Sequence, residues 1–207
     1  TVLPQQRISM KKSLLIFLSI ILTGCASYRA ATLQDYSPVT FVNVTESKNN
    51  SLLVAAKKLD ETDCKNYLDR NVIRAGYQPI QLFIKNNSDK TYDFSPRRIN
   101  LPCANYDQVA SRVHTSTIGR VAGYGIGALI IFPLVIPAVI DGIKSSEANQ
   151  ALDLDFSLKT ARDELIHPGF SLNKLLFIPR EGYRSPLIFN LIEIESKSAE
   201  EFQIYTN

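Results

Sequence analysis

The sequence predicts a mainly β fold: an antiparallel β-sandwich into which an apolar helical hairpin is inserted. Two observations lead to this prediction. Short runs of alternating apolar and polar residues, separated by turn-forming residues, recur through the middle and the carboxy-terminal third of the chain. Between them lies a stretch of 20 residues, 121–140, without any charged residue. We expect the sandwich to span residues 38–207 and the hairpin to occupy about 107–152.

The first part of the predicted sandwich holds one clear strand and one ambiguous segment. Residues 39–45 alternate well enough for a strand, and residues 46–50 form a cluster of turn-forming residues. Residues 52–59 are apolar, then alanine-rich, then basic. This composition leaves both strand and helix open for that segment.

The clearest β signal is the strict alternation of residues 78–85. Residues 86–90 follow with Asn and Asp, whose side chains bond their own main chain and favour turns. Residues 91–94 alternate again. We therefore predict a β-hairpin in which 78–85 pairs with 91–94.

The carboxy-terminal third repeats the same pattern in three β-rich runs, 171–178, 186–194 and 200–205. Their spacing is typical of an antiparallel sandwich. Strand-turn units such as residues 79–88 resemble those of immunoglobulin-like domains in exported bacterial proteins, which implies an immunoglobulin-like sandwich. The tryptophan that packs between the cysteines of antibody domains is absent, because the chain contains no tryptophan.

The amino-terminal segment has the three zones of an export signal. Lys11 and Lys12 follow Met10, an apolar run occupies 13–22, and small residues precede Cys25. The ending Leu22-Thr23-Gly24-Cys25 resembles the lipobox of bacterial lipoproteins. The resemblance implies diacylation of Cys25, cleavage before it and acylation of the new amino terminus. It also implies the outer membrane, because Ala26 and not aspartate follows the cysteine. We expect the anchored protein to face the periplasm.

This signal sets the expected order of segments. Residues 1–9 precede the only methionine, so we expect them to be upstream translation. Residues 10–24 are then the signal peptide. Residues 25–37 are small and polar without a period, and we expect them to form a tether between the lipid and the folded body.

The charge balance argues against a nucleic-acid partner. Three of the 23 Lys and Arg residues (Arg7, Lys11 and Lys12) precede Cys25, whereas none of the 20 Asp and Glu residues does. The chain from Cys25 onward therefore carries 20 basic and 20 acidic residues, a formal net charge of zero. Without a net positive field, nucleic-acid binding loses its main electrostatic support.

The remaining cysteines and histidines suggest a disulfide but no metal site. An exported compartment is oxidising, so we expect Cys64 and Cys103 to pair, with two separate buried thiols as the alternative. The only histidines, His114 and His167, lack the spacing of zinc ligands. No cofactor is expected beyond the covalent lipid on Cys25.

Two prolines shape the predicted insertion. Pro133 and Pro137 lack the backbone donor that an unbroken helix needs, so we predict a hairpin with arms at about 110–131 and 137–152 and a bend at 132–136. The bend is the most apolar part. The residues expected to contact a membrane or a partner there are Ile131, Phe132, Leu134, Val135 and Ile136.

Glycines recur every fourth residue in the first arm, at Gly119, Gly123 and Gly127, and so fall on one helix face. Such a face allows another helix to approach closely. The segment resembles glycine-zipper segments of bacterial envelope proteins. We expect the second arm of the same chain to be the packing partner. Its small residues are Ala138, Gly142 and Ser145.

The sequence leaves three roles open for the apolar bend. It dips into the outer membrane as a second anchor, it docks into another protein or a second copy of the chain, or it covers one face of the sandwich. We favour the first role, because an apolar run of this length would be an unusually large exposed patch on a monomer.

Sequence motifs give little support to catalysis. The chain has no Gly-x-Ser-x-Gly elbow and no phosphate-binding loop ending in Lys-Ser or Lys-Thr. The acidic residues Asp153, Asp155, Asp163 and Glu164 lack calcium-loop spacing, and we expect them on the solvated face of a helix. The predicted role is therefore non-enzymatic, structural or binding, in the bacterial envelope. A subunit of a secretion or export complex is the alternative, and an envelope hydrolase is a distant third.

Overall fold

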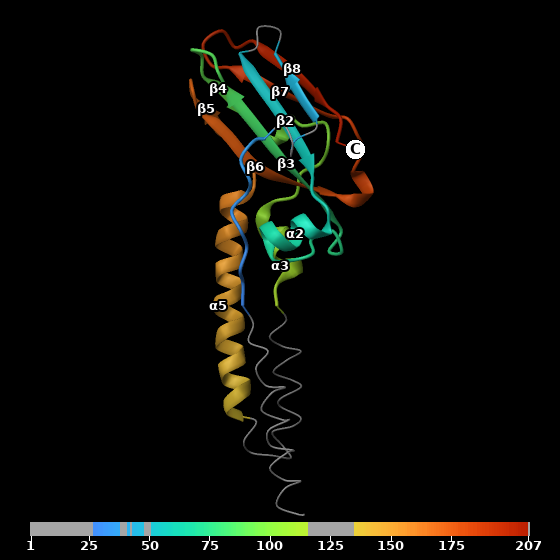
Figure 1. The fold of residues 1–207 in the computed structure, drawn as a ribbon, viewed down its shortest axis with the longest axis vertical. Helices are drawn as coiled ribbons and strands as arrows, with labels where there is room; N and C mark the ends of the chain where they lie inside the picture. Colours follow the sequence, from blue (N-terminus) through green and yellow to red (C-terminus); the bar gives the residue numbers. More distant parts are fainter. Residues whose placement is uncertain (1–26, 38–40, 42, 48–50, 116–134, 207) are drawn as a thin grey trace, which may run out of the picture. The chain divides into compact units, whose positions relative to one another are not determined.

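The structure is a computed structural model (Figure 1). It describes residues 27–37, 41, 43–47, 51–115 and 135–206. Its contacts divide the chain into two units. One unit contains residues 1–28 and 115–150. The other, which we call the body, contains residues 29–114 and 151–207 and includes all the described strands.

The body is built from two four-stranded sheets in which all neighbouring strands are antiparallel (Figure 1). The order in the first sheet is β1 (Asn43–Glu46), β2 (Leu52–Lys58), β3 (Tyr77–Asn86) and β6 (Ser171–Pro179). The order in the second is β5 (Glu164–Ile166), β4 (Tyr92–Phe94), β7 (Leu187–Glu193) and β8 (Ala199–Ile204). The mainly β prediction is confirmed, and the ambiguous segment 52–59 forms a strand.

One apolar core joins the two sheets. The face of β3 that carries Ile80, Leu82 and Ile84 is fully buried in it, as the alternation of that strand predicts. From the second sheet, Phe94 packs edge-to-face on Phe189, with ring centroids 6.1 Å apart. Burial of these large side chains from both sheets is the main favourable contribution to the sandwich.

The predicted hairpin of 78–85 with 91–94 is wrong. β3 and β4 belong to different sheets, and both edges of β3 are already occupied, by β2 and β6. The crossing between the sheets is fixed by the buried Asn86. Its Nδ2 donates to the carbonyl oxygens of Lys90 (2.7 Å) and Ile166 (3.0 Å). Its Oδ1 accepts from the backbone N–H of Ser88 (3.0 Å). The turn-forming residues 86–90 therefore lead the chain from one sheet to the other, and they do not reverse it within one sheet.

Helices lie in three of the connections between the described strands. α2 (Glu61–Leu68) follows β2, and its capping residue Asp60 accepts a hydrogen bond from the Asp63 backbone at 2.8 Å. The short 3₁₀ helix η1 (Pro96–Arg98), α3 (Tyr106–Val113) and α5 (Val135–Lys159) lie between β4 and β5 in sequence. A second 3₁₀ helix, η3 (Arg180–Gly182), follows β6.

α5 is longer than the predicted second arm at both ends. It starts at Val135, so Val135 and Ile136 are helical and not part of the bend. Pro137 is tolerated because backbone N–H groups in the first helical turn have no partner within the helix. The helix also passes Leu152 and ends at Lys159, because Phe156 is fully buried and stacks on Phe177 of β6 at 5.7 Å. Of the four acidic residues expected on a helix, Glu164 lies in β5 and Asp163 just before it.

Residues 29–36, which we call the strap, do not form the free tether that the sequence predicts. The carbonyl oxygen of Gln34 accepts hydrogen bonds from the side chains of Gln81 on β3 (2.7 Å) and Asn173 on β6 (3.1 Å). The Tyr36 ring stacks on Phe83 of β3, with centroids 5.2 Å apart. The strap therefore contacts the face of β3 opposite the core, where Gln81 and Phe83 are also buried.

The two ends of the long β4–β5 connection bind the outer edge of β6. The Ala104 N–H donates to the carbonyl oxygen of Phe177 (2.8 Å), and the Ala161 N–H donates to that of Leu175 (2.8 Å). Unpaired strand edges promote aggregation. These contacts occupy part of the outer edge of β6.

Candidate functional site

Most of the predicted site residues lie outside the part of the chain that the structure describes. These are Cys25, Gly119, Gly123, Gly127, Ile131, Phe132 and Leu134. Val135 and Ile136 form the start of α5. The described residues instead reveal where the body connects to the segments that contain the predicted site.

The chain passes between the units at residues 28/29, 114/115 and 150/151. Hydrogen bonds join the body residues next to these three points, and we call this region the exit pole. There, the Asp69 carboxylate accepts from the Arg29 backbone N–H (3.0 Å) and from the Arg70 guanidinium (3.1 Å). Arg70 also donates to the carbonyl oxygen of Val113 (3.2 Å). Next to it, His114 Nε2 lies 2.6 Å from Asp153 Oδ1. Contacts within the body thus link all three exits.

Asp69 is the centre of this network because of its backbone as well as its charge. It ends α2 in the left-handed conformation, with φ of 49°. Burial opposes ionisation, but hydrogen bonds from the Lys65 side chain and the Arg29 backbone, with the charges of Lys65 and Arg70, hold the pKa of its carboxyl below the usual value. The carboxylate therefore stays ionised and binds the start of the strap.

Lys159, the last residue of α5, anchors the strap from the other side. Its ammonium is buried, and it donates to the carbonyl oxygens of Ala31 (2.7 Å) and Tyr67 (2.6 Å) and to the Asp155 carboxylate (2.7 Å). These three bonds use all three donors of the side chain. The sequence analysis did not single out Lys159. The available signal was an aspartate four residues before a lysine on one helix.

Three of the four acidic residues considered as metal ligands contact three different partners. Asp153 faces His114, Asp155 binds Lys159, and Asp163 accepts from the Ser95 hydroxyl (2.6 Å). Across the described residues, no three His, Cys, Asp or Glu side chains gather closely enough to hold a metal ion.

The predicted disulfide is not formed in the structure, where Cys64 and Cys103 are both free thiols. Cys64 is buried in α2, whereas the thiol of Cys103 lies 3.7 Å from the carbonyl oxygen of Leu101. Burial, together with neighbouring acidic charges, raises the pKa of Cys64 to about 12, and burial raises that of Cys103 to about 12. Both thiols therefore stay protonated and are weak nucleophiles.

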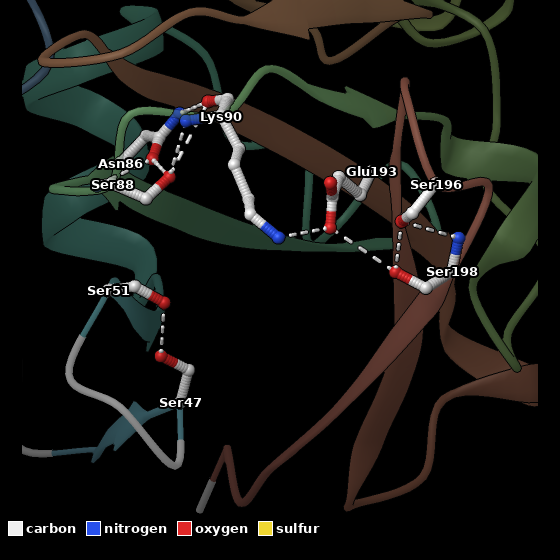
Figure 2. Close-up of polar contacts among 8 residues, drawn as sticks. All are labelled: Ser47, Ser51, Asn86, Ser88, Lys90, Glu193, Ser196 and Ser198. Carbon is white, nitrogen blue, oxygen red and sulfur yellow. Dashed lines mark hydrogen bonds and ion pairs between the residues drawn. The ribbon is translucent and has the colours of Figure 1, made fainter.

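A polar cluster fixes the loops at the Asn86 end of β3 (Figure 2). The Lys90 ammonium reaches Glu193 at 2.8 Å, and the same carboxylate oxygen accepts from the Ser198 hydroxyl at 3.4 Å. Nearby, the hydroxyls of Ser47, just after β1, and Ser51, just before β2, are 3.0 Å apart. The cluster thus ties the β3–β4 connection to the β7–β8 turn.

The electrostatics of this cluster suit a structural ion pair and not a serine–lysine catalytic pair. The hydrogen bond with Glu193 raises the pKa of Lys90, and the hydrogen bond from Lys90 lowers that of Glu193. A catalytic lysine must lose its proton to act as a base, which this environment opposes. The Thr91 hydroxyl lies 3.4 Å from His167 Nδ1, beyond the range typical of a nucleophile and its base.

None of the described helices is both long and apolar enough to span a membrane. Comparison with protein-family models, with curated proteins and with solved structures finds no match to this chain.

Proposed function

We propose that this chain is a lipid-anchored protein of the bacterial outer membrane with a non-enzymatic, structural or binding role. In this proposal, acylated Cys25 is the first membrane contact and the apolar segment around 121–140 is the second. The observation that carries the proposal is the exit pole. The segment that leads to the lipobox and both ends of the connection that holds the apolar segment leave the body there.

The docked strap shortens the distance between lipid and body. Only three residues lie between Cys25 and Arg29, the first residue of the strap, so four residue-to-residue steps join them. Fully extended, they span about 13 Å. Acyl chains on Cys25 would therefore hold the exit pole close to the bilayer surface. Apolar side chains that enter the same bilayer would add to the anchoring and slow release.

The body fits an immunoglobulin-like sandwich, and we propose this class for it. In immunoglobulin domains the second strand pairs with the fifth across one sheet, and the third with the sixth across the other. Here β3 pairs with β6 as the second strand does with the fifth. β4 pairs with β7 as the third strand does with the sixth, and β8 pairs with the other edge of β7. This correspondence makes β2, β3, β4, β6, β7 and β8 the strands of the common core. Such sandwiches are rigid scaffolds whose loops are free to bind partners.

Membrane flotation of cell envelopes tests the anchoring. We expect the natural protein in the outer-membrane fraction. A Cys25→Ser variant, exported by the signal peptide of a periplasmic protein, should float partly, because the apolar segment still binds lipid. The Cys103→Ser variant is the control and should distribute like the natural protein. Natural protein that fails to float contradicts the anchor, and fully soluble, monomeric Cys25→Ser protein contradicts the second contact.

The second candidate is a subunit of an export complex whose insertion docks on a protein partner. It is favoured by Leu154 and Leu158, which lie one turn apart on α5 with 62% and 54% of their surfaces exposed. A photocrosslinking residue at position 135 in living cells separates the two candidates. Lipid adducts support the membrane contact, whereas discrete protein adducts support the complex.

A further inference from the structure

A groove of about 410 Å³ lies where two connections of the body run side by side. The pairing of β4 with β5 sets Phe94 opposite Glu164. The next residues, Ser95 and Asp163, are therefore adjacent, and the serine hydroxyl donates to the carboxylate at 2.6 Å. Beyond this contact the groove opens between η1 and the residues that follow α5. Its volume is in the range of small-molecule sites.

Two arginines line the groove, one on each connection. Arg97 belongs to η1 and Arg162 follows α5, and both side chains are exposed. Within the described part of the chain, neither guanidinium has an ion pair or a hydrogen bond. Asp163 is the one acidic residue in the lining, and its carboxylate accepts from Ser95. The groove is therefore lined by two cations, neither of which is paired with a residue that the structure describes.

Three buried apolar residues also line the groove. Ile99, Leu101 and Ala161 are each at most 8% exposed, and all three line it.

We propose that this groove binds a phosphate group, with Arg97 and Arg162 as the two groups that hold it. Guanidinium groups present paired N–H donors that match the oxygens of phosphate. A carboxylate has two oxygens, which one arginine can satisfy, whereas a phosphate has three acceptor oxygens for two arginines. The phosphate could belong to a water-soluble phosphomonoester or to a lipid headgroup, since both present the same chemistry.

The first test is an NMR titration of the full mature chain in non-ionic detergent with inorganic phosphate at constant ionic strength. We expect the backbone amides of Arg97 and Arg162 to shift, and Arg97→Gln or Arg162→Gln to weaken binding about tenfold, as expected for loss of a charge-assisted bond. The matched control is Arg184→Gln, which removes an exposed arginine outside the groove and should change affinity less than twofold. No shift in the groove, or equal weakening by all three variants, overturns the proposal.

The second test distinguishes the sources of phosphate. One arm uses glycerol 3-phosphate, and the other uses phosphatidylcholine vesicles that contain phosphatidic acid, with the Cys25→Ser chain. Binding of glycerol 3-phosphate that depends on both arginines assigns the groove to a soluble phosphomonoester. Recruitment to the vesicles that depends on both arginines assigns it to a lipid headgroup. If binding depends on the two arginines in neither arm, the proposal is overturned.

Discussion

At the scale of single residues, Lys159 contributes more to the stability of the body than its place at the end of a helix suggests. A buried ammonium is costly unless its donors are satisfied, and here it binds two backbone carbonyl oxygens and one carboxylate. These partners belong to the strap, to α2 and to α5 itself. The sequence could predict the Asp155–Lys159 pair from its spacing. It could not predict the two carbonyl oxygens, because backbone acceptors leave no signature in the side-chain pattern.

Replacement of Lys159 by methionine keeps most of the side-chain volume but removes the hydrogen bonds to two carbonyl oxygens and to the Asp155 carboxylate. We expect the free energy of unfolding to fall by about 2–3 kcal/mol, measured by urea denaturation. Lys174→Met is the control, because the more exposed Lys174 donates to a single carbonyl oxygen, that of Leu158. It should cost less than about 1 kcal/mol. Equal losses in the two variants would contradict the role assigned to Lys159.

The Lys90–Glu193 pair predicts a specific pH dependence. The folded protein keeps Glu193 ionised below its usual pKa of 4.5, so the stabilisation by this group is complete above that pH and is lost as the pH falls through the lowered pKa. For Lys90, stabilisation is complete below pH 10.5 and is lost as the pH rises through the raised pKa. We expect Glu193→Gln to be less stable than the natural protein near neutral pH and to approach it at pH 3.

Thermal unfolding across pH 3–7 measures this convergence. Glu195→Gln serves as the control, because Glu195 is exposed on the same turn and is not among the residues of the cluster in Figure 2. Its stability should follow that of the natural protein at every pH. A stability difference for Glu193→Gln that persists unchanged at pH 3 would show that the ion pair is not responsible.

At the scale of elements, alternation predicts where strands lie but not which strands they join. β3 and β4 both carry the expected period, yet they fall in different sheets because β3 is paired on both edges. The strap shows a related limit. Its irregular composition predicts a tether, but its main chain supplies acceptors to polar side chains of β3 and β6. Such contacts depend on tertiary position and not on the period of the segment.

The crossing between the sheets can be tested at two adjacent asparagines. Asn86→Ala removes the donor to two carbonyl oxygens, one of them in a buried contact with Ile166. We expect a loss of about 2–3 kcal/mol in the free energy of unfolding. Asn87→Ala is the control, because Asn87 is exposed and its hydrogen bond to Ser51 is made by the backbone N–H. It should lower the free energy of unfolding by less than about 0.5 kcal/mol. Urea denaturation of both variants measures the difference, and similar losses would contradict the role of Asn86 in the crossing.

At the scale of the whole molecule, composition and periodicity predict a mainly β body interrupted by helical sequence, and the two sheets confirm this. The common exit pole could not be predicted, because Arg29, Asp69, His114 and Asp153 come from four separated parts of the sequence. The lipobox and the glycines were the strongest sequence signals, and they stay predictions. The pole adds a physical reason to connect them, since the chain leaves the body toward both of them at the exit pole.

Mass spectrometry of the amino-terminal tryptic peptide tests the central claim most directly. Trypsin cleaves after Arg29, so the mature protein isolated from membranes should release residues 25–29 as one short peptide. We predict that this peptide carries a diacylglyceryl group on the Cys25 sulfur and a further acyl chain on its amino group. A peptide with a free Cys25 thiol, or one that still continues into the apolar segment 13–22, would contradict the lipid anchor and the membrane role built on it.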